Sequence, residues 1–376
     1  MPAVNNVLVL GSGLAGTATA IQLASQGVAV DLVEIRPDVA AVGSGITLQG
    51  NALRELRALG VWERVRDNGY AFDVTGIRAP DAAGSVVAEI PDVRTGGPDL
   101  PAVLGMPRPD LARILADRAA EAGAKPRFGT TFTELNQDAA GVDVIFSDGL
   151  TARYDLVVGA DGVRSRTRRA VGIDLETRPV GMGIWRAFGP RPAGVTRTDL
   201  YYGGACYIAG YCPTGENSLY AYIVEAAQDR GGLSPEQQLA TMKRLSEAYH
   251  GPWDEIRETL VDPDRVNYTW FETHLLDGPW NRGRVVLIGD AAHTCPPTLA
   301  QGGAQALEDA AVLAELLLER DAVDQQLWNA FTARRYHRAK TVVDASNQLA
   351  QWLLDHQQGD VPALIRRVAA LVCRPA

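Results

Sequence analysis

The N-terminal part of the chain carries the pattern that most constrains its fold. An apolar run at 7–10 leads directly into a glycine-rich turn at 11–16, and an alanine-rich segment with helical character continues through Ala24. Gly27 ends that segment, and a second apolar run covers 28–33. A strand, a glycine-rich turn, a helix and a strand in this order form a βαβ unit with G-x-G-x-x-G spacing. The pattern predicts a parallel sheet covered by helices, as in dinucleotide-binding domains.

The residues of this unit suit a bound dinucleotide. Gly11 permits the tight turn, Gly13 lets the backbone approach a pyrophosphate, and Gly16 lets the helix pack close to the strand. Glu34 closes the second strand, where a carboxylate accepts hydrogen bonds from an adenosine ribose and disfavours a 2′-phosphate. The unit therefore favours FAD or NAD over NADP.

A second glycine-bearing strand end lies near the end of the chain. The apolar run 285–288 is closed by Gly289 and Asp290, which places a small residue and a carboxylate at the strand end. In an open α/β sheet, ligands bind at that edge. A rigid Pro296-Pro297 turn follows, and Gly302-Gly303 open a helix whose free N–H groups favour electron-rich partners. An ordinary strand–helix connection is the alternative, and the three features together argue against it.

A third strand of this type occupies the middle of the chain. The run 155–158 has buried character and leads through Gly159 to Asp161 and Gly162. The three motifs, in this order and spacing, resemble those of the group A flavoprotein monooxygenases, the family of p-hydroxybenzoate hydroxylase. In the last motif the resemblance covers Gly289, Asp290, Ala291, Ala292, His293, Pro297, Gln301, Gly302, Glu308 and Asp309.

The resemblance implies FAD as the cofactor and gives roles to residues of the motifs. In the family, the residue at Asp290 holds the ribityl chain, and Pro297 and the helix start at 302 line the edge of the isoalloxazine ring. The loop corresponding to 43–46 lies beside the ring and carries it between an inner and an outer position. The Asp-Gly motif at Asp161 serves both FAD and a transient nicotinamide donor.

Two arginines join the predicted site through the same resemblance. Arg36, two residues after Glu34, reaches toward the adenosine phosphates in the family, with a plain surface arginine as the alternative. In the family, an arginine at the position of Arg108 contacts the flavin phosphate or ring. Ala300 stands where the family usually has Gly, and Ala304 where it often has Asn. The predicted FAD-binding residues are Gly11, Gly13, Leu14, Ala15, Gly16, Glu34, Ile35, Arg36, Ser44, Gly45, Arg108, Asp161, Gly289, Asp290, Gly302 and Gly303.

Two segments differ in composition from the α/β motifs. Residues 70–104 alternate short β-prone pieces with Pro, Gly and Asp, and residues 178–277 are rich in β-prone and aromatic residues. We predict an α/β fold with a Rossmann-like, doubly wound FAD-binding domain made of 1–69, 105–177 and 278–376. The two β-prone segments then form an interleaved antiparallel β-sheet domain that covers the flavin and binds the substrate.

The candidate substrate contacts come mainly from the second β-prone segment. Trp185-Arg186 stands where relatives often have an aromatic–Arg pair, and Arg186 suits an anionic substrate group or a reactive flavin oxygen. A structural ion pair is the alternative for Arg186, and sheet packing is the alternative for most of the tyrosines. His293 is expected to be a buried structural histidine rather than a base. The predicted catalytic residues are Arg186, Tyr211, Tyr222 and Pro297.

The composition limits the partners and the compartment. A net charge of −9 argues against affinity for nucleic acid or acidic membranes. The four cysteines lack metal-ligand spacing and are too few for a disulfide framework, so we expect no metal and a reducing cytosol. We recognise neither a signal peptide nor a membrane-spanning run. The expected protein is a cytoplasmic monomer or homodimer.

The activity implied by the resemblance is that of a single-component FAD-dependent monooxygenase. NADH or NADPH reduces the FAD, O2 adds at flavin C4a, and the hydroperoxide hydroxylates a small aromatic or heteroaromatic substrate. A halogenase or a reductase on the same scaffold is one alternative, although the chain has no lysine-centred halogenase motif. A flavoprotein oxidase or dehydrogenase, and a non-catalytic FAD- or ligand-binding protein, are the others.

Overall fold

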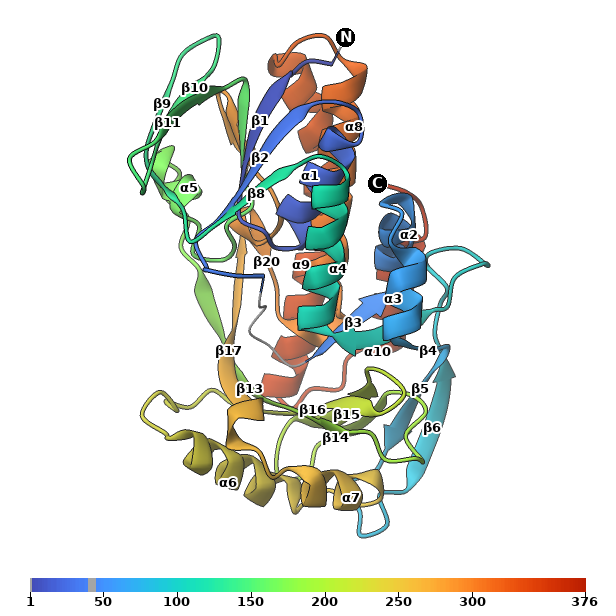
Figure 1. The fold of residues 1–376 in the computed structure, drawn as a ribbon. Coiled ribbons are helices and arrows are strands. Elements are labelled where there is room, and N and C mark those ends of the chain that lie inside the picture. Colours follow the sequence, from blue (N-terminus) through green and yellow to red (C-terminus); the bar gives the residue numbers. More distant parts are fainter. Residues whose placement is uncertain (1, 40–44) are drawn as a thin grey trace.

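The structure, a computed structural model, describes residues 2–39 and 45–376. The lobe at the top of Figure 1 is built on a six-stranded sheet with the order β18-β19-β12-β1-β2-β8. Neighbouring strands are parallel except in the β18–β19 pair. The strands are β1 (Asn6–Leu10), β2 (Ala29–Glu34), β8 (Lys125–Phe128), β12 (Leu156–Gly159), β18 (Asn281–Arg282) and β19 (Val285–Leu287).

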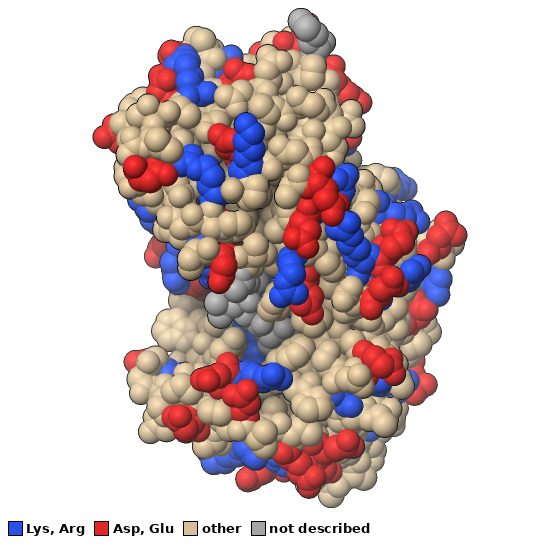
Figure 2. All heavy atoms as spheres, viewed as in Figure 1, with Lys and Arg blue, Asp and Glu red and all other residues tan. Residues whose placement is uncertain are grey.

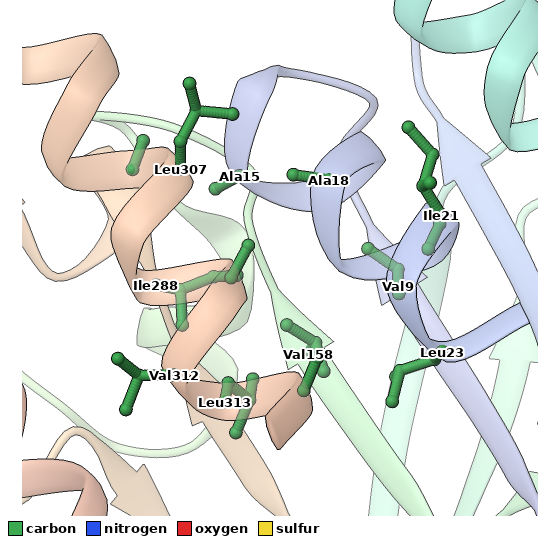
Figure 3. Close-up of a cluster of buried hydrophobic side chains, with 14 of the residues drawn as sticks. Val9, Ala15, Ala18, Ile21, Leu23, Val158, Ile288, Leu307, Val312 and Leu313 are labelled. Atoms are coloured by element: carbon green, nitrogen blue, oxygen red, sulfur yellow. The ribbon is translucent and has the colours of Figure 1, made fainter. Parts of the chain in front are cut away.

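The central strands are apolar throughout because both faces of this sheet are covered. Val9 faces the helical layer, whereas Leu8 and Leu10 face the sheet β11-β10-β9. Figure 3 shows the helical side of the core, where Ala15 of α1 lies beside Leu307 of α8. The elements of the two layers are α1 (Leu14–Ala24), α4 (Arg108–Glu121), α8 (Gly302–Glu319), β9 (Phe132–Gln137), β10 (Val142–Phe146), β11 (Thr151–Tyr154) and the short helix α5 (Arg166–Ala170).

A small sheet and a long helix link this lobe to the lower one. The small sheet has the order β3-β7-β4, and α9 runs down the molecule from the upper lobe to the lower sheet (Figure 1). Near the end of α9, Ala350 packs with Met182 and Phe271 of the lower sheet. The linking elements and their neighbours are β3 (Gly45–Gln49), β4 (Tyr70–Phe72), β7 (Val103–Pro107), α2 (Gly50–Ala58), α3 (Trp62–Asn68), α9 (Gln325–Leu354) and α10 (Val361–Val372).

The lower lobe is an eight-stranded sheet with α6 and α7 beneath it (Figure 1). Its order is β20-β17-β13-β16-β15-β14-β5-β6, antiparallel except where β14 meets β5. The strands are β5 (Val74–Arg78), β6 (Val86–Pro91), β13 (Arg178–Pro190), β14 (Asp199–Tyr202), β15 (Ile208–Pro213), β16 (Ser218–Ala226), β17 (Val266–Leu275) and β20 (His293–Thr294). The helices are α6 (Pro235–Ser246) and α7 (Pro252–Thr259), with one-turn helices η1 (Pro263–Arg265), η2 (Gly289–Ala291) and η3 (Pro297–Leu299) elsewhere.

The two faces of the lower sheet have different neighbours. Trp185 and Ala187 point down into a core shared with α6 and α7. Met182 and Ile184 point up, into the cluster that contains Ala350 of α9. Side chains alternate between the faces of a strand, so Arg186 belongs to the upper face, which looks toward the FAD-binding lobe.

The early β-prone segment does reach the later one in space. Residues Gly76, Ile77 and Arg78 of β5 pair in register with Asp199, Leu200 and Tyr201 of β14. Strands β4 and β7, by contrast, pair with β3 in the small sheet. The division into two domains with the boundaries given above stays a prediction.

Candidate active site

The three glycine motifs meet at one edge of the six-stranded sheet. Gly11 has a left-handed backbone with φ +103°, and a Cβ there would lie 2.4 Å from the carbonyl oxygen of Ala160. Gly289 is also left-handed, with φ +58°, and a Cβ there would lie 3.0 Å from the Cβ of Ala15. Both positions therefore favour glycine. The first motif touches each of the other two, and together they form one continuous edge.

The first turn leaves room for a phosphate group. A Cβ at Gly16 would lie 2.0 Å from the carbonyl oxygen of Gly11, so this glycine allows α1 to begin directly beneath the turn. At Gly13, no atom lies within 4 Å of the Cβ position. No side chain caps the start of α1, so the N–H groups of Leu14 and Ala15 are available to an anion.

Glu34 is held at the end of β2 by hydrogen bonds from its neighbours. Its carboxylate accepts from the backbone N–H and the hydroxyl of Ser12 at 2.9 and 3.1 Å, and from the N–H of Arg36 at 3.0 Å. Ile35 is 59% exposed, and the Arg36 side chain is exposed as well. The carboxylate thus has a fixed position beside the glycine turn, while the guanidinium of Arg36 extends into solvent.

Asp161 binds the start of α5 with both of its carboxylate oxygens. One oxygen accepts from the hydroxyl of Ser165, and the other from the N–H and the hydroxyl of Thr167, both at 2.9 Å. Asp161 therefore fixes the turn after β12. The buried Arg168, which the sequence reasoning missed, donates to the carbonyl oxygens of Ala291 and Val163 at 2.8 and 2.9 Å. It ties the second motif to the third.

Asp290 differs from these residues because its side chain has no hydrogen-bond partner in residues 2–39 and 45–376. The side chain is exposed at the surface, yet protein surrounds it closely, and this desolvation raises the pKa of its carboxyl group. The nearby charges of His293 and of Arg108, which is exposed at the start of α4, oppose the rise. The backbone is held from behind, where the carbonyl oxygen of Asp290 lies 2.9 Å from Nε2 of His274.

A buried ionic network fixes the backbone beneath Asp290. Asp309 of α8 accepts from the N–H of Gly289 at 2.8 Å and lies 2.7 Å from Nε2 of His293. The other carboxylate oxygen of Asp309 accepts from Nε of Arg335, a residue of α9 that is 0% exposed. His293 is itself buried, in agreement with the structural role expected for it.

The network continues through Glu308 to α2 and to the end of the chain. Glu308 accepts from Arg338 at 2.7 and 2.8 Å, from Arg335 at 3.1 Å and from the side chain of Asn51 at 3.0 Å. Arg338 also donates to the carbonyl oxygens of Leu371 and Arg374. The sequence reasoning included Glu308 and Asp309 in the last motif but did not find their partners. Two arginines at i and i+3 on a helix were the available signal.

The start of α8 lies next to the first glycine turn. A Cβ at Gly303 would lie 3.0 Å from Leu14, whereas the space around Gly302 is open. Pro297 is exposed and begins η3. Ala300 ends η3 in a left-handed conformation, with φ 51° and ψ 33°. The position where the family usually has glycine therefore keeps a glycine-like backbone in this chain.

Arg186 and Tyr222 lie side by side on the upper face of the lower sheet. They are direct partners across β13 and β16. Arg186 donates to the hydroxyl of Thr269, and the hydroxyl of Tyr222 has no hydrogen-bond partner among the described residues. Burial raises the pKa of Tyr222 well above its ordinary value, so its hydroxyl remains a neutral donor. This pair was predicted to contact the substrate, and its placement suits that role.

The expectation for Tyr211 needs correction, because the residue lies on the opposite face of the sheet. Tyr211 is 1% exposed and packs in the lower core with Tyr201 and Tyr249. Its hydroxyl donates to Asp199 at 2.7 Å. A side chain enclosed between the sheet and α6–α7 has no route to a substrate above the sheet, so we remove it from the candidate site.

The predicted loop at 43–46 lies partly outside the described residues, and Ser44 is one of the residues that are not described. Gly45 is described and begins β3. A Cβ at Gly45 would lie 2.6 Å from Cβ of Tyr220, so the β3 strand and the lower sheet touch at this point. Figure 2 shows the surface hollowed between the two lobes, with acidic and basic side chains interspersed over the face in view.

These features fit FAD. The close glycine turn at Gly11, the open space at Gly13 and the carboxylate of Asp290, which has no partner among the described residues, provide places for a pyrophosphate and a polyhydroxyl chain along one edge. When bound, FAD supplies the redox and oxygen chemistry that side chains lack. A dinucleotide turn beside a second Gly-Asp strand end, with a sheet facing both, is typical of the dinucleotide-binding flavoproteins.

Comparison with known proteins agrees. Residues 5–346 match the family described as FAD binding domain. The chain is 30% identical over 355 residues to the aurachin C monooxygenase/isomerase of Stigmatella aurantiaca, covering 92% of this chain and 90% of that protein. It is 29% identical over 385 residues to the 6-hydroxynicotinate 3-monooxygenase of Pseudomonas fluorescens, covering 97% and 98%. The solved tetrameric form of 2-methyl-3-hydroxypyridine-5-carboxylic acid oxygenase aligns with a TM-score of 0.81 at 25% identity, covering 97% and 96%.

The chain belongs to the FAD-binding family of group A flavoprotein monooxygenases, and it is a FAD-dependent monooxygenase. Its fold is the predicted α/β FAD-binding fold with an interleaved sheet. No group of three His, Cys, Asp or Glu residues in 2–39 and 45–376 is arranged to hold a metal ion. Within the same ranges, no helix has both the length and the apolar character that a bilayer span requires.

Proposed function

We propose that this monooxygenase hydroxylates a small aromatic or heteroaromatic substrate, with NADH or NADPH as the electron donor and O2 as the oxygen source. One observation carries the proposal: Arg186 and Tyr222 stand side by side on the sheet face that looks toward the FAD-binding edge. A cation, a neutral hydroxyl and aromatic rings suit a planar ring that bears an acidic group. The names of the relatives include a hydroxynicotinate and a hydroxypyridine carboxylate, which are rings of this kind.

The proposed FAD contacts are the residues of the shared edge. Gly13, Leu14 and Ala15 bind the pyrophosphate through backbone N–H groups, and Glu34 binds the adenosine ribose. Asp290 accepts hydrogen bonds from the ribityl hydroxyls, since its carboxylate has no partner among residues 2–39 and 45–376. The remaining predicted contacts, which we retain as proposals, are Gly11, Gly16, Ile35, Arg36, Ser44, Gly45, Arg108, Asp161, Gly289, Gly302 and Gly303.

On the substrate side, the chain's own residues bind, orient and exclude water. Arg186 pairs with an anionic group of the substrate, and Tyr222 donates a hydrogen bond or packs against the ring. Pro297, at the rigid turn before α8, limits the space beside the ring. Enclosure between the lobes keeps water from the reacting atoms.

The test is the fate of labelled oxygen during turnover. The FAD-loaded enzyme is screened with hydroxylated aromatic acids for faster NAD(P)H oxidation, and products are analysed after reaction under ¹⁸O2. A true substrate should speed NAD(P)H oxidation at least about tenfold, or about 1.4 kcal/mol of barrier, and one labelled atom should enter the product. Substrate oxidation without label would instead indicate an oxidase or dehydrogenase. Ligand binding without any substrate oxidation would indicate a non-catalytic flavoprotein.

The assembly and compartment form a separate proposal. We infer a cytoplasmic monomer or homodimer, supported by the mixed surface charge and by the four cysteines, all of them free thiols. Size-exclusion chromatography with light scattering measures the mass directly. A tetramer, the form named for one structural relative, would overturn the expected stoichiometry.

A further inference from the structure

One row of residues crosses the upper face of the lower sheet from a polar end to an apolar end. The strand registers place one residue of each of six strands in line. The strands follow one another across the sheet in the order β17, β13, β16, β15, β14 and β5. Directly opposite residues share a face. In order, the row contains Asn267, Arg186, Tyr222, Gly210, Leu200 and Ile77.

Gly210 makes a gap in this row, and the ring of Tyr222 fills it. A Cβ at Gly210 would lie 2.7 Å from Cζ and 2.8 Å from the hydroxyl oxygen of Tyr222. Neighbouring strands are about 4.8 Å apart, so a ring whose far end sits above the next strand must lie along the sheet. Tyr222 is therefore laid flat over β15, with its ring 5.1 Å from that of Tyr220.

The two ends of the row differ in chemistry. At one end, Arg186 carries a positive charge, and Oδ1 of the neighbouring Asn267 is buried without a hydrogen-bond partner in the described structure. At the other end, Leu200 and Ile77 are half-buried aliphatic side chains. The flat ring of Tyr222 lies between the ends and offers an aromatic surface on which a second ring can stack.

We propose that Gly210 is a specificity-determining residue that keeps Tyr222 flat, so that the site accepts an elongated or two-ring aromatic acid. The carboxylate lies at Arg186 and the apolar end extends over Tyr222 toward Leu200. This inference rests on the proposed function, because it places the substrate on the upper face of the sheet. It assigns the orientation of the substrate, which the family relationship leaves open.

The substitution Gly210→Ala tests the geometry without disturbing the fold. Gly210 does not have a positive φ, so alanine fits its backbone, and the atoms that must move are the far end of the Tyr222 side chain. The added methyl group forces that ring off β15. The matched control is Gly189→Ala in β13, where the nearest atom to the new Cβ is the hydroxyl oxygen of Thr259 at 3.5 Å.

The first measurement needs no ligand. The chain is labelled with 3-fluorotyrosine, and the ¹⁹F signal of Tyr222 is assigned as the one missing from Tyr222→Phe. Gly210→Ala should move this signal and leave those of the lower-core tyrosines in place, whereas Gly189→Ala should not move it. An unchanged Tyr222 signal in Gly210→Ala would show that the ring does not lie over Gly210 and would overturn the proposal.

The second measurement compares two acids that differ by one fused ring, 4-hydroxybenzoate and 6-hydroxy-2-naphthoate. Their dissociation constants are read from the perturbed absorbance of FAD in the loaded protein. Gly210→Ala should weaken the naphthoate at least about tenfold, or about 1.4 kcal/mol, and the benzoate little. In a Tyr222→Ala background the same change should lose its effect on this ratio.

Two binding results would overturn the proposal: an equal effect of Gly210→Ala on both acids, or a wild-type protein that binds neither. Both readouts are independent of turnover. A failure to incorporate labelled oxygen would therefore remove the proposed function while leaving the flat Tyr222 and the ring-size preference intact. Conversely, the enzyme could incorporate labelled oxygen while Gly210→Ala leaves the ¹⁹F signal of Tyr222 unmoved. That result would contradict only the role of Gly210 and would leave the proposed function intact.

Discussion

The cofactor side and the substrate side of the site are stabilised in opposite ways. Beneath Gly289, the carboxylate of Asp309 is fully buried, and its hydrogen bonds come from a backbone N–H, His293 and Arg335. Across from it, the hydroxyl of Tyr222 has no partner in the described structure. Buried contacts fix the backbone behind the cofactor edge before any ligand arrives, whereas on the substrate side the hydroxyl of Tyr222 keeps unmet hydrogen-bonding capacity. The cofactor edge therefore rests on a rigid framework, and the substrate side relies on contacts that the ligand brings.

The largest expected effect comes from breaking the buried network. Arg335→Met should leave the carboxylates of Asp309 and Glu308 without their shared partner, and should cost about 3–5 kcal/mol of unfolding free energy. Urea denaturation measures the loss, and titration with FAD should show weaker binding. The control is Arg334→Met next to it. Its partners are the partly exposed Glu315 and the carbonyl oxygen of Ala376, and their loss should cost about 0–1 kcal/mol. Equal effects of the two variants would contradict the rigid-site interpretation.

The next effect concerns pH and His274, which supports the backbone of Asp290. Burial lowers the pKa of His274 to about 4, from an ordinary value of 6.5. The unfolded chain therefore binds a proton at higher pH than the folded chain does. The contribution of His274 to the unfolding free energy is therefore fully present above about pH 6.5. It declines by about 3 kcal/mol as the pH falls to about 4, because protonation then favours the unfolded chain.

The variant His274→Gln isolates this contribution. Unfolding free energies measured from pH 7 to pH 4 should fall less steeply for the variant than for the wild type. Substitution of the exposed His337 should leave the slope unchanged. Parallel slopes for His274→Gln and the wild type would show that His274 titrates normally.

A smaller effect is expected at Asp290, where a substitution should change FAD binding but not the stability of the fold. Its side chain has no partner in the described structure, so Asp290→Ala should leave the unfolding free energy of the FAD-free protein nearly unchanged. FAD affinity should fall on the order of ten- to a hundredfold, because charge-assisted hydrogen bonds of about 1.5–3 kcal/mol are lost. Fluorescence titration with FAD measures this. An unchanged dissociation constant would show that Asp290 does not contact the cofactor.

The smallest effect is expected at Ala300, which adopts a left-handed backbone. Glycine relieves that strain but loses more entropy on folding, so Ala300→Gly should raise the unfolding free energy by at most about 1 kcal/mol. Thermal unfolding with and without FAD measures it. The matched change Ala306→Gly, in the middle of α8, should destabilise the protein. A similar loss at both positions would contradict the expected relief of strain at Ala300.

The sequence anticipated the positions where the backbone alone sets the requirement. Gly11 and Gly289 have positive φ angles and close contacts that glycine satisfies, and the apolar runs became β1, β12 and β19. The expectation that Tyr211 faces the substrate was wrong. Period-two alternation shows which residues share a face of a strand, but β15, with the sequence IAGYCP, is apolar on both faces. The pattern therefore gave no sign of which face looks toward the flavin.

The chain by itself determined the dinucleotide turn, the order of the motifs and the flavoprotein class, because these depend on residues that are neighbours in sequence. Only the tertiary structure decided which distant side chains meet. Asn51 hydrogen-bonds Gln301 and Glu308 across about two-thirds of the chain, and Arg335 reaches Asp309 from another helix. The row from Arg186 over Gly210 to Leu200 exists only once the strands are in register. A buried polar or charged group must have a hydrogen-bond partner. Which partner it meets depends on how the elements pack, and no local sequence pattern encodes that packing.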